Sequence, residues 1–324
     1  MLVGIANAQL PIKSGVVTGG ISHTMLPWFK DSFLEITDDV DEAKQSNKHV
    51  LLFFHLDGCP YCDQMVKDFN QPSLKKFIQQ HFDVIAINIR GEKEVAINEN
   101  QPLSEKELAA QVEVQYTPTV LFLNQKNEVV ARTNGYRKPK KLKKVLDYVY
   151  NKAYAELTLA QYIETTKKTS NYQPQSHEMF QKIKDFSTLK TPLTIIFEDK
   201  SCDACAYFYN TTLKDSAVVN EFNAFSVVRF DASSTQTIID NKGNQTTPKD
   251  WVQQLKLNYR PGIVLFNEGD EITRIDGFLY NFHFQEVLRY VSGDFYQEFA
   301  TYNAYLAYRQ RELLKQGIDI DIHK

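Results

Sequence analysis

The sequence has few cysteines and no long apolar run. All four cysteines in its 324 residues lie in two C-x-x-C motifs, Cys59-Pro60-Tyr61-Cys62 and Cys202-Asp203-Ala204-Cys205. Because every cysteine belongs to a close pair, the pattern indicates thiol–disulfide chemistry in two copies. The longest apolar runs, such as residues 50–54, are far shorter than the ~20 residues that a membrane-spanning helix needs.

The sequence also lacks an excess of either charge. Its 37 Lys and Arg residues stand against 40 Asp and Glu residues, for a formal net charge of −3. This balance gives no indication of a nucleic-acid partner or of binding to an anionic membrane surface. The length suits two domains rather than one, and a hydrophobic content of 43% predicts packed cores.

A proline follows each cysteine pair at the same distance. The first cysteines of the two motifs, Cys59 and Cys202, are 143 residues apart (202 − 59), and so are Pro118 and Pro261 (261 − 118). One structural unit is therefore written twice. We expect a cis peptide bond before each proline. The preceding residues, Thr117 and Arg260, are predicted to border a groove where an extended substrate pairs with the backbone.

Periodicity predicts the same order of elements in both units. The first unit has predicted strands at 49–55, 84–89, 120–123 and 129–132 and helices at 38–46, 63–69, 104–112 and 139–150. Ser104 and Glu107 form a capping box at the start of the third helix. The second unit has predicted strands at 193–197, 225–230, 263–266 and 271–275 and a closing helix at 284–290.

A C-x-x-C motif between a strand and a helix places its first cysteine at the helix N-terminus. The free N–H groups and the helix dipole there favour a thiolate, which is the nucleophile in disulfide exchange. We therefore predict that Cys59 and Cys202 attack and that Cys62 and Cys205 resolve the mixed disulfide. Tyr61, between the first two cysteines, is expected to be exposed and to contact substrate.

Each unit resembles a thioredoxin-fold protein, and specifically the SoxW-type thioredoxins of bacterial sulfur-oxidation systems. In the first unit the resemblance rests on Phe53-Phe54, the Cys59–Cys62 motif, Leu103-Ser104-Glu105-Lys106-Glu107-Leu108, Tyr116-Thr117-Pro118-Thr119 and Gly135-Tyr136. In the second it rests on Phe197-Glu198, the Cys202–Cys205 motif, Gly277-Phe278 and the closing helices through Gln316-Gly317-Ile318-Asp319-Ile320.

This resemblance implies an α/β fold of two tandem thioredoxin-like domains, each with a central mixed sheet and flanking helices. It also implies a periplasmic dithiol protein that reduces partner disulfides or thiol adducts and is itself kept reduced by a membrane thiol-electron transporter. No cofactor or metal is expected. A single Cys₄ zinc site is disfavoured by the strand context, the matching prolines and the ~140-residue separation of the two pairs.

Two features depart from the thioredoxin pattern. Phe53 and Ile196 occupy the position, six residues before the first cysteine, where thioredoxins have a buried acid. Asp203, beside Cys202, is expected to raise the pKa of that thiol by charge repulsion, which Arg260 would offset if it pointed at the sulfur. We therefore predict different reduction potentials for the two pairs.

The predicted boundaries divide the chain into five segments. They are a flexible lead-in or residual signal segment at 1–27, domain one at 28–153, a helical linker at 154–189, domain two at 190–295, and a C-terminal helix and tail at 296–324. An A-x-A pattern at Ala6-Asn7-Ala8 favours export, with a cytoplasmic location as the alternative. Phe299, Tyr302, Tyr305 and Tyr308 are expected to pack the last helix on domain two.

Two functional alternatives remain open at this level. One is a net disulfide oxidase or isomerase, which the reduction potential distinguishes from a reductase. In the other, domain two is a binding module that holds a partner through Arg260 and its groove, while domain one alone turns over.

Overall fold

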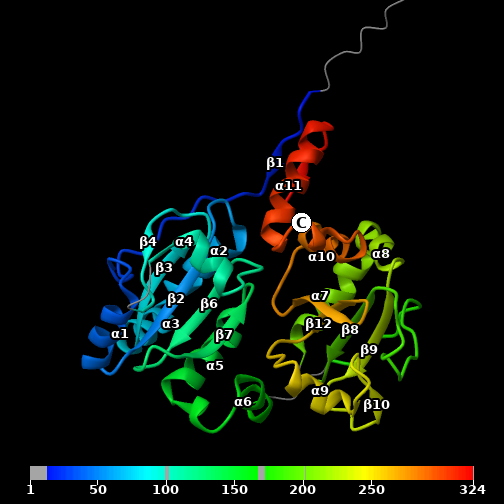
Figure 1. Cartoon of the computed structure of the whole chain (residues 1–324), viewed down its shortest axis with the longest axis horizontal. Coiled ribbons are helices and arrows are strands. Elements are labelled where there is room, and N and C mark those ends of the chain that lie inside the picture. Colours follow the sequence, from blue (N-terminus) through cyan, green and yellow to red (C-terminus); the bar gives the residue numbers. More distant parts are fainter. Residues whose placement is uncertain (1–12, 99–101, 167–171, 201, 324) are drawn as a thin grey trace, which may run out of the picture.

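The computed structural model describes residues 13–98, 102–166, 172–200 and 202–323 of the chain. Two α/β domains lie side by side, and helix α11 (Tyr302–Lys315) lies above the junction between them (Figure 1). The predicted fold class, two tandem domains with mixed sheets, is confirmed.

The first domain is built on a four-stranded sheet of order β3-β2-β6-β7. Strand β2 is parallel to β3 and antiparallel to β6, which pairs antiparallel with β7. The bounds are β2 His49–His55, β3 Phe82–Asn88, β6 Thr119–Leu123 and β7 Val129–Asn134. All of β2 is buried, because Leu51 and Phe53 belong to the core on one face and Leu52 and Phe54 to the core on the other.

The second domain repeats this topology in the order β13-β12-β8-β9. Its bounds are β8 Leu193–Glu198, β9 Ser226–Asp231, β12 Gly262–Asn267 and β13 Asp270–Ile275. Strand β8 is parallel to β9 and antiparallel to β12, as β2 is to β3 and β6. The repeat inferred from the cysteine and proline spacing is therefore a repeat of the whole sheet.

Most predicted helices form within a few residues of their expected limits. They are α1 Ile36–Gln45, α2 Pro60–Phe69, α4 Glu105–Gln111, α5 Pro139–Tyr150 and α10 Asn281–Ser292. The capping box is present, since Ser104 accepts from the Glu107 N–H and the Glu107 side chain accepts from the Ser104 N–H. Helix α9 (Pro248–Gln254) begins at Pro248, with Thr247 as its N-cap.

Two helices were not predicted, α3 (Pro72–His81) and α8 (Ser216–Phe222). Each buries a narrow apolar stripe, Leu74 and Ile78 in α3 and Val218 and Phe222 in α8. Both residue pairs have the i, i+4 spacing of one helix face, but such short stripes are weak signals among polar neighbours.

The predicted helical linker is helical only in its first part. A 3₁₀ turn at Ala153–Ala155 and helix α6 (Leu159–Thr165) are followed, from residue 172 to 189, by described backbone without a helix. Phe180 forms a parallel bridge with Val227 of β9. The prediction was wrong here because β9 is an edge strand, whose free backbone groups pair with an extended segment rather than a helix.

The lead-in was also expected to be flexible through residue 27, and this is wrong for its described part. Strand β1 (Val17–Thr18) pairs in parallel with β14 (Ile320–Asp321), so the two ends of the chain are joined. Residues 1–12, which include the A-x-A pattern, lie outside the described residues. The tyrosines of α11 pack as predicted, with Tyr302 and Tyr305 buried in the core of domain two.

A packed interface holds the two domains together. Arg137, which follows β7, is buried and donates to the carbonyl and carboxylate of Asp276, which follows β13. Tyr136 forms an antiparallel bridge with Phe278, and the Tyr116 hydroxyl lies 2.7 Å from that of Thr273. These contacts link the equivalent edges of the two sheets, so the two domains pack directly against each other.

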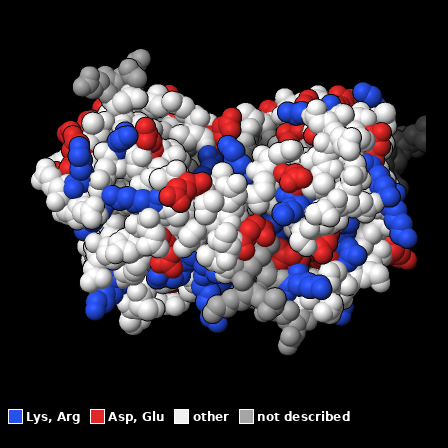
Figure 2. All heavy atoms as spheres, turned by 90° about the horizontal axis from the view of Figure 1, so that it is seen from below, with Lys and Arg blue, Asp and Glu red and all other residues white. Residues whose placement is uncertain are grey.

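Positive and negative side chains are interspersed over the face seen from below (Figure 2). This mixed distribution agrees with the near balance of total charge and offers no single-sign patch on that face for a nucleic acid. Within the described ranges, none of the helices has the length and apolar character to cross a membrane.

Candidate functional site

The first cysteine pair lies where strand β2 passes into helix α2. Cys59 is the N-cap of α2, and its sulfur accepts a hydrogen bond from the Cys62 N–H at 3.1 Å. The two cysteines are joined in a disulfide, with their Cα atoms 5.3 Å apart. The prediction that Cys59 sits at a helix N-terminus is therefore confirmed, and the N–H groups there can stabilise its thiolate.

The predicted groove residues of domain one lie beside this disulfide. The Thr117-Pro118 bond is cis, as expected. The carbonyl oxygen of Thr117 lies 3.7 Å from the Cys59 sulfur, and its hydroxyl lies 3.5 Å from the same atom. The fold thus brings together a nucleophile and a backbone segment that are 58 residues apart.

A pocket of about 390 Å³ opens over Cys59. Its walls come in part from two loops of domain one, the one before α2 and the one that contains Tyr116 and Thr117. The other walls come from Gly20 near the start of the chain, from His283 of α10, and from Leu306 of α11. The Cys59 side chain retains 6% of its surface, and Cys62 has none. Cys59 is therefore the sulfur of this pair that a substrate can reach.

Tyr61 was predicted to be exposed, and this is wrong. It is only 5% exposed, its hydroxyl accepts from the Tyr280 N–H at 2.8 Å, and it hydrogen-bonds with His283 Nδ1 at 3.1 Å. Both partners belong to domain two. The Tyr61 side chain is covered because α10, which lies more than 200 residues later in the sequence, packs against the first motif.

Two histidines near the first site are uncharged at neutral pH. Burial lowers the pKa of His55, at the end of β2, to about 4, and the pKa of His283 to about 4 as well. His55 lies 3.3 Å from His23 and stacks on Phe53. It therefore behaves as a buried strand histidine.

The second pair has the same local geometry and a different environment. Cys202 is the N-cap of α7 (Asp203–Asn210), accepts from the Cys205 N–H at 3.0 Å, and is disulfide-bonded to Cys205. The Arg260-Pro261 bond is cis, as predicted. However, both cysteine side chains are fully buried. In this conformation neither sulfur can be attacked from solvent.

Arg260 does not border an open groove as predicted. It is 5% exposed, and its guanidinium donates to Asp199 Oδ2 at 3.0 Å and to Glu164 Oε1 at 2.9 Å. Asp199 directly follows β8, and Glu164 belongs to α6. Because these two carboxylates bind the guanidinium group, Arg260 points to them rather than to a substrate. The side chain of Asp203, whose effect on Cys202 was predicted, lies outside the described part of the structure.

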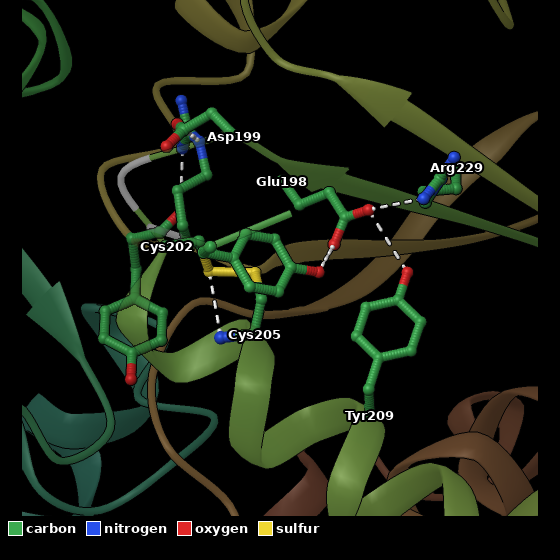
Figure 3. The surroundings of a disulfide bond; sticks show 9 residues. Glu198, Asp199, Cys202, Cys205, Tyr209 and Arg229 are labelled. Carbon is green, nitrogen blue, oxygen red and sulfur yellow. Dashed lines mark hydrogen bonds and ion pairs between the residues drawn. A yellow bond between two sulfur atoms is a disulfide. The ribbon is translucent and has the colours of Figure 1, made fainter. Parts of the chain in front are cut away.

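Glu198 is a candidate functional residue that the sequence analysis missed. It ends β8 beside the second disulfide, is 1% exposed, and accepts from Tyr172 at 2.6 Å, Tyr209 at 3.2 Å and Arg229 at 3.0 Å (Figure 3). Burial raises its pKa, against the opposing effect of these donors. Its position in the repeat could have identified it. Glu198 lies four residues before Cys202, as His55 lies four residues before Cys59, and the two are 143 residues apart (198 − 55).

Among the described residues, no group of three or more His, Cys, Asp or Glu side chains is arranged to hold a metal ion. The geometry around the first pair provides a cysteine at a helix N-terminus, a second cysteine one turn later, and a pocket beside the cis-proline loop, which is what disulfide exchange requires.

Comparisons with known proteins agree with this fold. The model of the thioredoxin-like domain family matches residues 36–150 and 179–292. No curated protein matches the sequence. Among solved structures, a thioredoxin-fold protein from Helicobacter pylori is 26% identical, with a TM-score of 0.32, over 40% of this chain and 88% of the other.

Two further solved structures are similar over single domains. A thioredoxin from Thermus thermophilus is 26% identical over 36% of this chain and 83% of its own, with a TM-score of 0.30. A disulphide isomerase from Xylella fastidiosa is 21% identical over 39% of this chain and 91% of its own, with a TM-score of 0.26. The two family matches together span more than half of the sequence. The chain therefore belongs to the thioredoxin-like domain family, with two tandem domains that each carry a C-x-x-C pair, and it is a thiol–disulfide oxidoreductase.

Proposed function

We propose that this oxidoreductase is a dithiol reductase that works at Cys59 and Cys62, and that its substrates are partner disulfides or thiol adducts. The observation that carries the proposal is the contrast between the two sites: Cys59 opens into a pocket beside Thr117, whereas Cys202 is fully buried. Reduced Cys59 attacks the substrate disulfide and releases one thiolate. Cys62 then attacks the Cys59 sulfur, releases the second thiolate, and leaves the protein disulfide.

The direction of the reaction is supported by the charges around Cys59. A strongly stabilised thiolate makes a cysteine pair a good oxidant, because it stabilises the reduced form. Here His283, which lines the pocket, and His55 both have a pKa of about 4, so neither adds a positive charge at neutral pH. Asp57 and Arg90, which also line the pocket, carry opposite charges and so add no net charge to it. The helix N-terminus is then the main stabilising feature, which favours a more reducing pair.

A second role for domain two is favoured by its contacts with the first site. Helix α10 supplies His283 to the pocket and covers Tyr61, while Cys202 and Cys205 remain buried. We therefore propose that domain two completes the site of domain one and binds the partner, rather than exchanging disulfides itself. A relay of electrons from Cys202 to Cys59 would need a conformation in which Cys202 is exposed.

We also propose that the protein works in the periplasm or another exported location, and that a membrane thiol-electron transporter returns electrons to it. The support is the resemblance to SoxW-type thioredoxins and the A-x-A pattern at residues 6–8. A cytoplasmic location is the alternative. Fractionation of cells that express the native gene decides between them, because recovery with cytoplasmic markers would contradict export.

The experiment that tests the proposed reaction measures each reduction potential separately. Cys59→Ser/Cys62→Ser isolates the second pair, and Cys202→Ser/Cys205→Ser isolates the first; both are titrated in glutathione buffers and followed by thiol-labelling mass spectrometry. We expect about −270 mV for the Cys59–Cys62 pair, as for a reductase. A value between about −120 and −180 mV would instead indicate an oxidase or isomerase.

A further inference from the structure

The pocket over Cys59 is a composite of segments that are far apart in the chain. Its walls include Gly20 from the N-terminal segment, Thr117 from the cis-proline loop, His283 from α10 and Leu306 from α11. Its volume of about 390 Å³ lies at the low end of the roughly 300–1,000 Å³ typical of small-molecule sites.

Helix α11 lies beside the loop where an extended substrate would pair with Thr117. The Tyr302 N–H donates to Gln115 Oε1 at 2.9 Å, and the Tyr302 ring packs on that of Tyr116, with centroids 5.1 Å apart. An extended chain rises about 3.3 Å per residue, so even three paired residues need roughly 10 Å of open edge. The first turn of α11 contacts Gln115 and Tyr116, the two residues before Thr117, and so restricts how far such a chain can extend along the loop.

The position of α11 is held by buried contacts. The Tyr305 hydroxyl donates to Glu286 Oε2 at 2.6 Å, and the Tyr302 hydroxyl donates to the His283 carbonyl at 3.1 Å. At its other end, the Gly15 N–H donates to the Leu314 carbonyl, and β1 pairs with β14. Both ends of the helix are thus held by contacts with other segments, and α11 forms one wall of the pocket.

We infer that the first site selects small disulfides, of the size of cystine, and excludes extended protein segments, with α11 setting the size limit. The inference deepens the proposed function and rests on it. The pocket walls combine apolar residues such as Leu56 and Leu306 with the charged residues Asp57 and Arg90. Arg90 can pair with a carboxylate of a small substrate such as cystine, and Asp57 with its ammonium group.

The reaction balances with the groups that the site contains. The Cys59 thiolate forms a bond to one cystine sulfur and releases one cysteine thiolate. The Cys62 thiolate then bonds to the Cys59 sulfur and releases the second cysteine. The protein loses two electrons and two protons, and cystine gains them as two cysteine thiols.

The test is a single-turnover experiment on the full chain. The protein is reduced, freed of reductant, and mixed with cystine or with insulin as a protein disulfide, and loss of Cys59 thiol is followed by quenched labelling and mass spectrometry. We expect cystine to react at least about tenfold faster than insulin, since misplacing a reacting group by about 1 Å can cost 100-fold in rate.

Two variants of α11 give a matched pair. Ala307 lines the pocket, whereas Ala304, three residues earlier, is exposed outside it. Ala307→Phe is expected to slow the cystine reaction by about tenfold or more, because the ring fills part of the pocket, while Ala304→Phe leaves the rate within about twofold. Thermal unfolding of both variants confirms that they are folded.

The outcomes separate the inference from the proposed function. Equal rates for insulin and cystine, or a cystine rate that Ala307→Phe leaves unchanged, would overturn the size limit while leaving the reductase intact. If neither disulfide oxidises Cys59, the proposed function fails, and the inference fails with it. Fast cystine reduction that depends on position 307 supports both.

Discussion

At the scale of single residues, the two predicted attacking cysteines differ in how far each residue is buried. Cys59 keeps 6% of its surface and faces a pocket, whereas Cys202 has none, although both are N-caps with the same hydrogen bond from the second cysteine. Disulfide exchange requires direct access of the attacking thiolate to a sulfur. The two pairs are therefore expected to react at different rates, although both are C-x-x-C motifs with the same local geometry.

This difference predicts which pair reacts first under native conditions. With limiting dithiothreitol and iodoacetamide, Cys59 should be alkylated at least about tenfold faster than Cys202, because access controls the rate of attack. Peptide mass spectrometry measures both. In concentrated guanidinium the two should label alike, which is the control. Equal native rates would show that domain two opens readily.

Three buried histidines predict a loss of stability in weak acid. Burial lowers the pKa of His49, His55 and His283 to about 4 in the folded protein, against about 6.5 when unfolded. Between these values the unfolded chain binds more protons, so stability falls as the pH drops from about 6.5 towards 4. Each histidine contributes roughly 1–2 kcal/mol of this loss at about pH 5.

The measurement is urea unfolding at pH 7 and pH 5 for the wild type and His55→Gln. The variant should lose less stability between the two pH values, because one proton-binding group of the unfolded state is gone. Burial raises the pKa values of Glu198 and Asp276, so these groups favour the folded state as the pH falls and oppose the effect of the histidines. The result is therefore the difference in slope between His55→Gln and the wild type. His177→Gln, at a half-exposed position, is the control; an unchanged slope in His55→Gln would refute the assignment.

At the scale of elements, the ends of β7 and β13 form the join between the domains. Arg137 and Asp276 are both buried there. Burial lowers the pKa of Arg137 and raises that of Asp276. Ion pairs of this kind add little net stability, but leaving one member unpaired is costly. The pair therefore specifies how the two sheet edges meet.

Removing the cation alone should be strongly destabilising. Arg137→Met leaves the Asp276 carboxylate buried without its partner and is expected to lower the free energy of unfolding by about 3–5 kcal/mol. Adding Asp276→Asn should recover part of the loss, because it removes the unpaired charge. Urea unfolding gives both values, with exposed Lys140→Met as the control. Additive losses in the double variant would mean that the two groups do not act as a pair.

Elements with strong local signals were predicted from the sequence. The run at 49–55 is β2, the capping box opens α4, and Pro139 begins α5. Residues 172–189 were not predicted as extended, because their structure depends on the free edge of β9 rather than on local propensity. The pairing of β1 with β14 joins segments about 300 residues apart, which no local pattern reveals.

At the scale of the whole molecule, a repeated unit is used asymmetrically. The terminal segments and α11 line the pocket of the first site, whereas both cysteines of the second pair are fully buried. Domain two supplies His283 and Tyr280 to the first motif. The tandem arrangement thus builds one open site from two domains.

This asymmetry predicts that the second pair is dispensable for turnover. Cys202→Ala/Cys205→Ala should keep most disulfide reductase activity, and its stability should fall modestly, since the disulfide closes a very short loop and contributes on the order of 1–3 kcal/mol. Turnover with cystine and dithiothreitol measures the effect. Cys59→Ser/Cys62→Ser, the matched control, should lose activity. Loss of most turnover in the second-pair variant would instead establish a relay between the two sites.

The sequence by itself determined the repeat, the strand–motif–helix order around each cysteine pair and the two cis prolines, because these depend on short-range spacing and on residue type. Only the tertiary structure decided that Tyr61 is buried, that Arg260 is bound by two carboxylates and that Cys202 is closed while Cys59 is open. Exposure is set by which distant segments pack over a residue. For Tyr61 and Cys59 those segments are α10, α11 and the chain ends, and for Arg260 they include α6. Their docking depends on contacts between distant parts of the chain rather than on any local pattern.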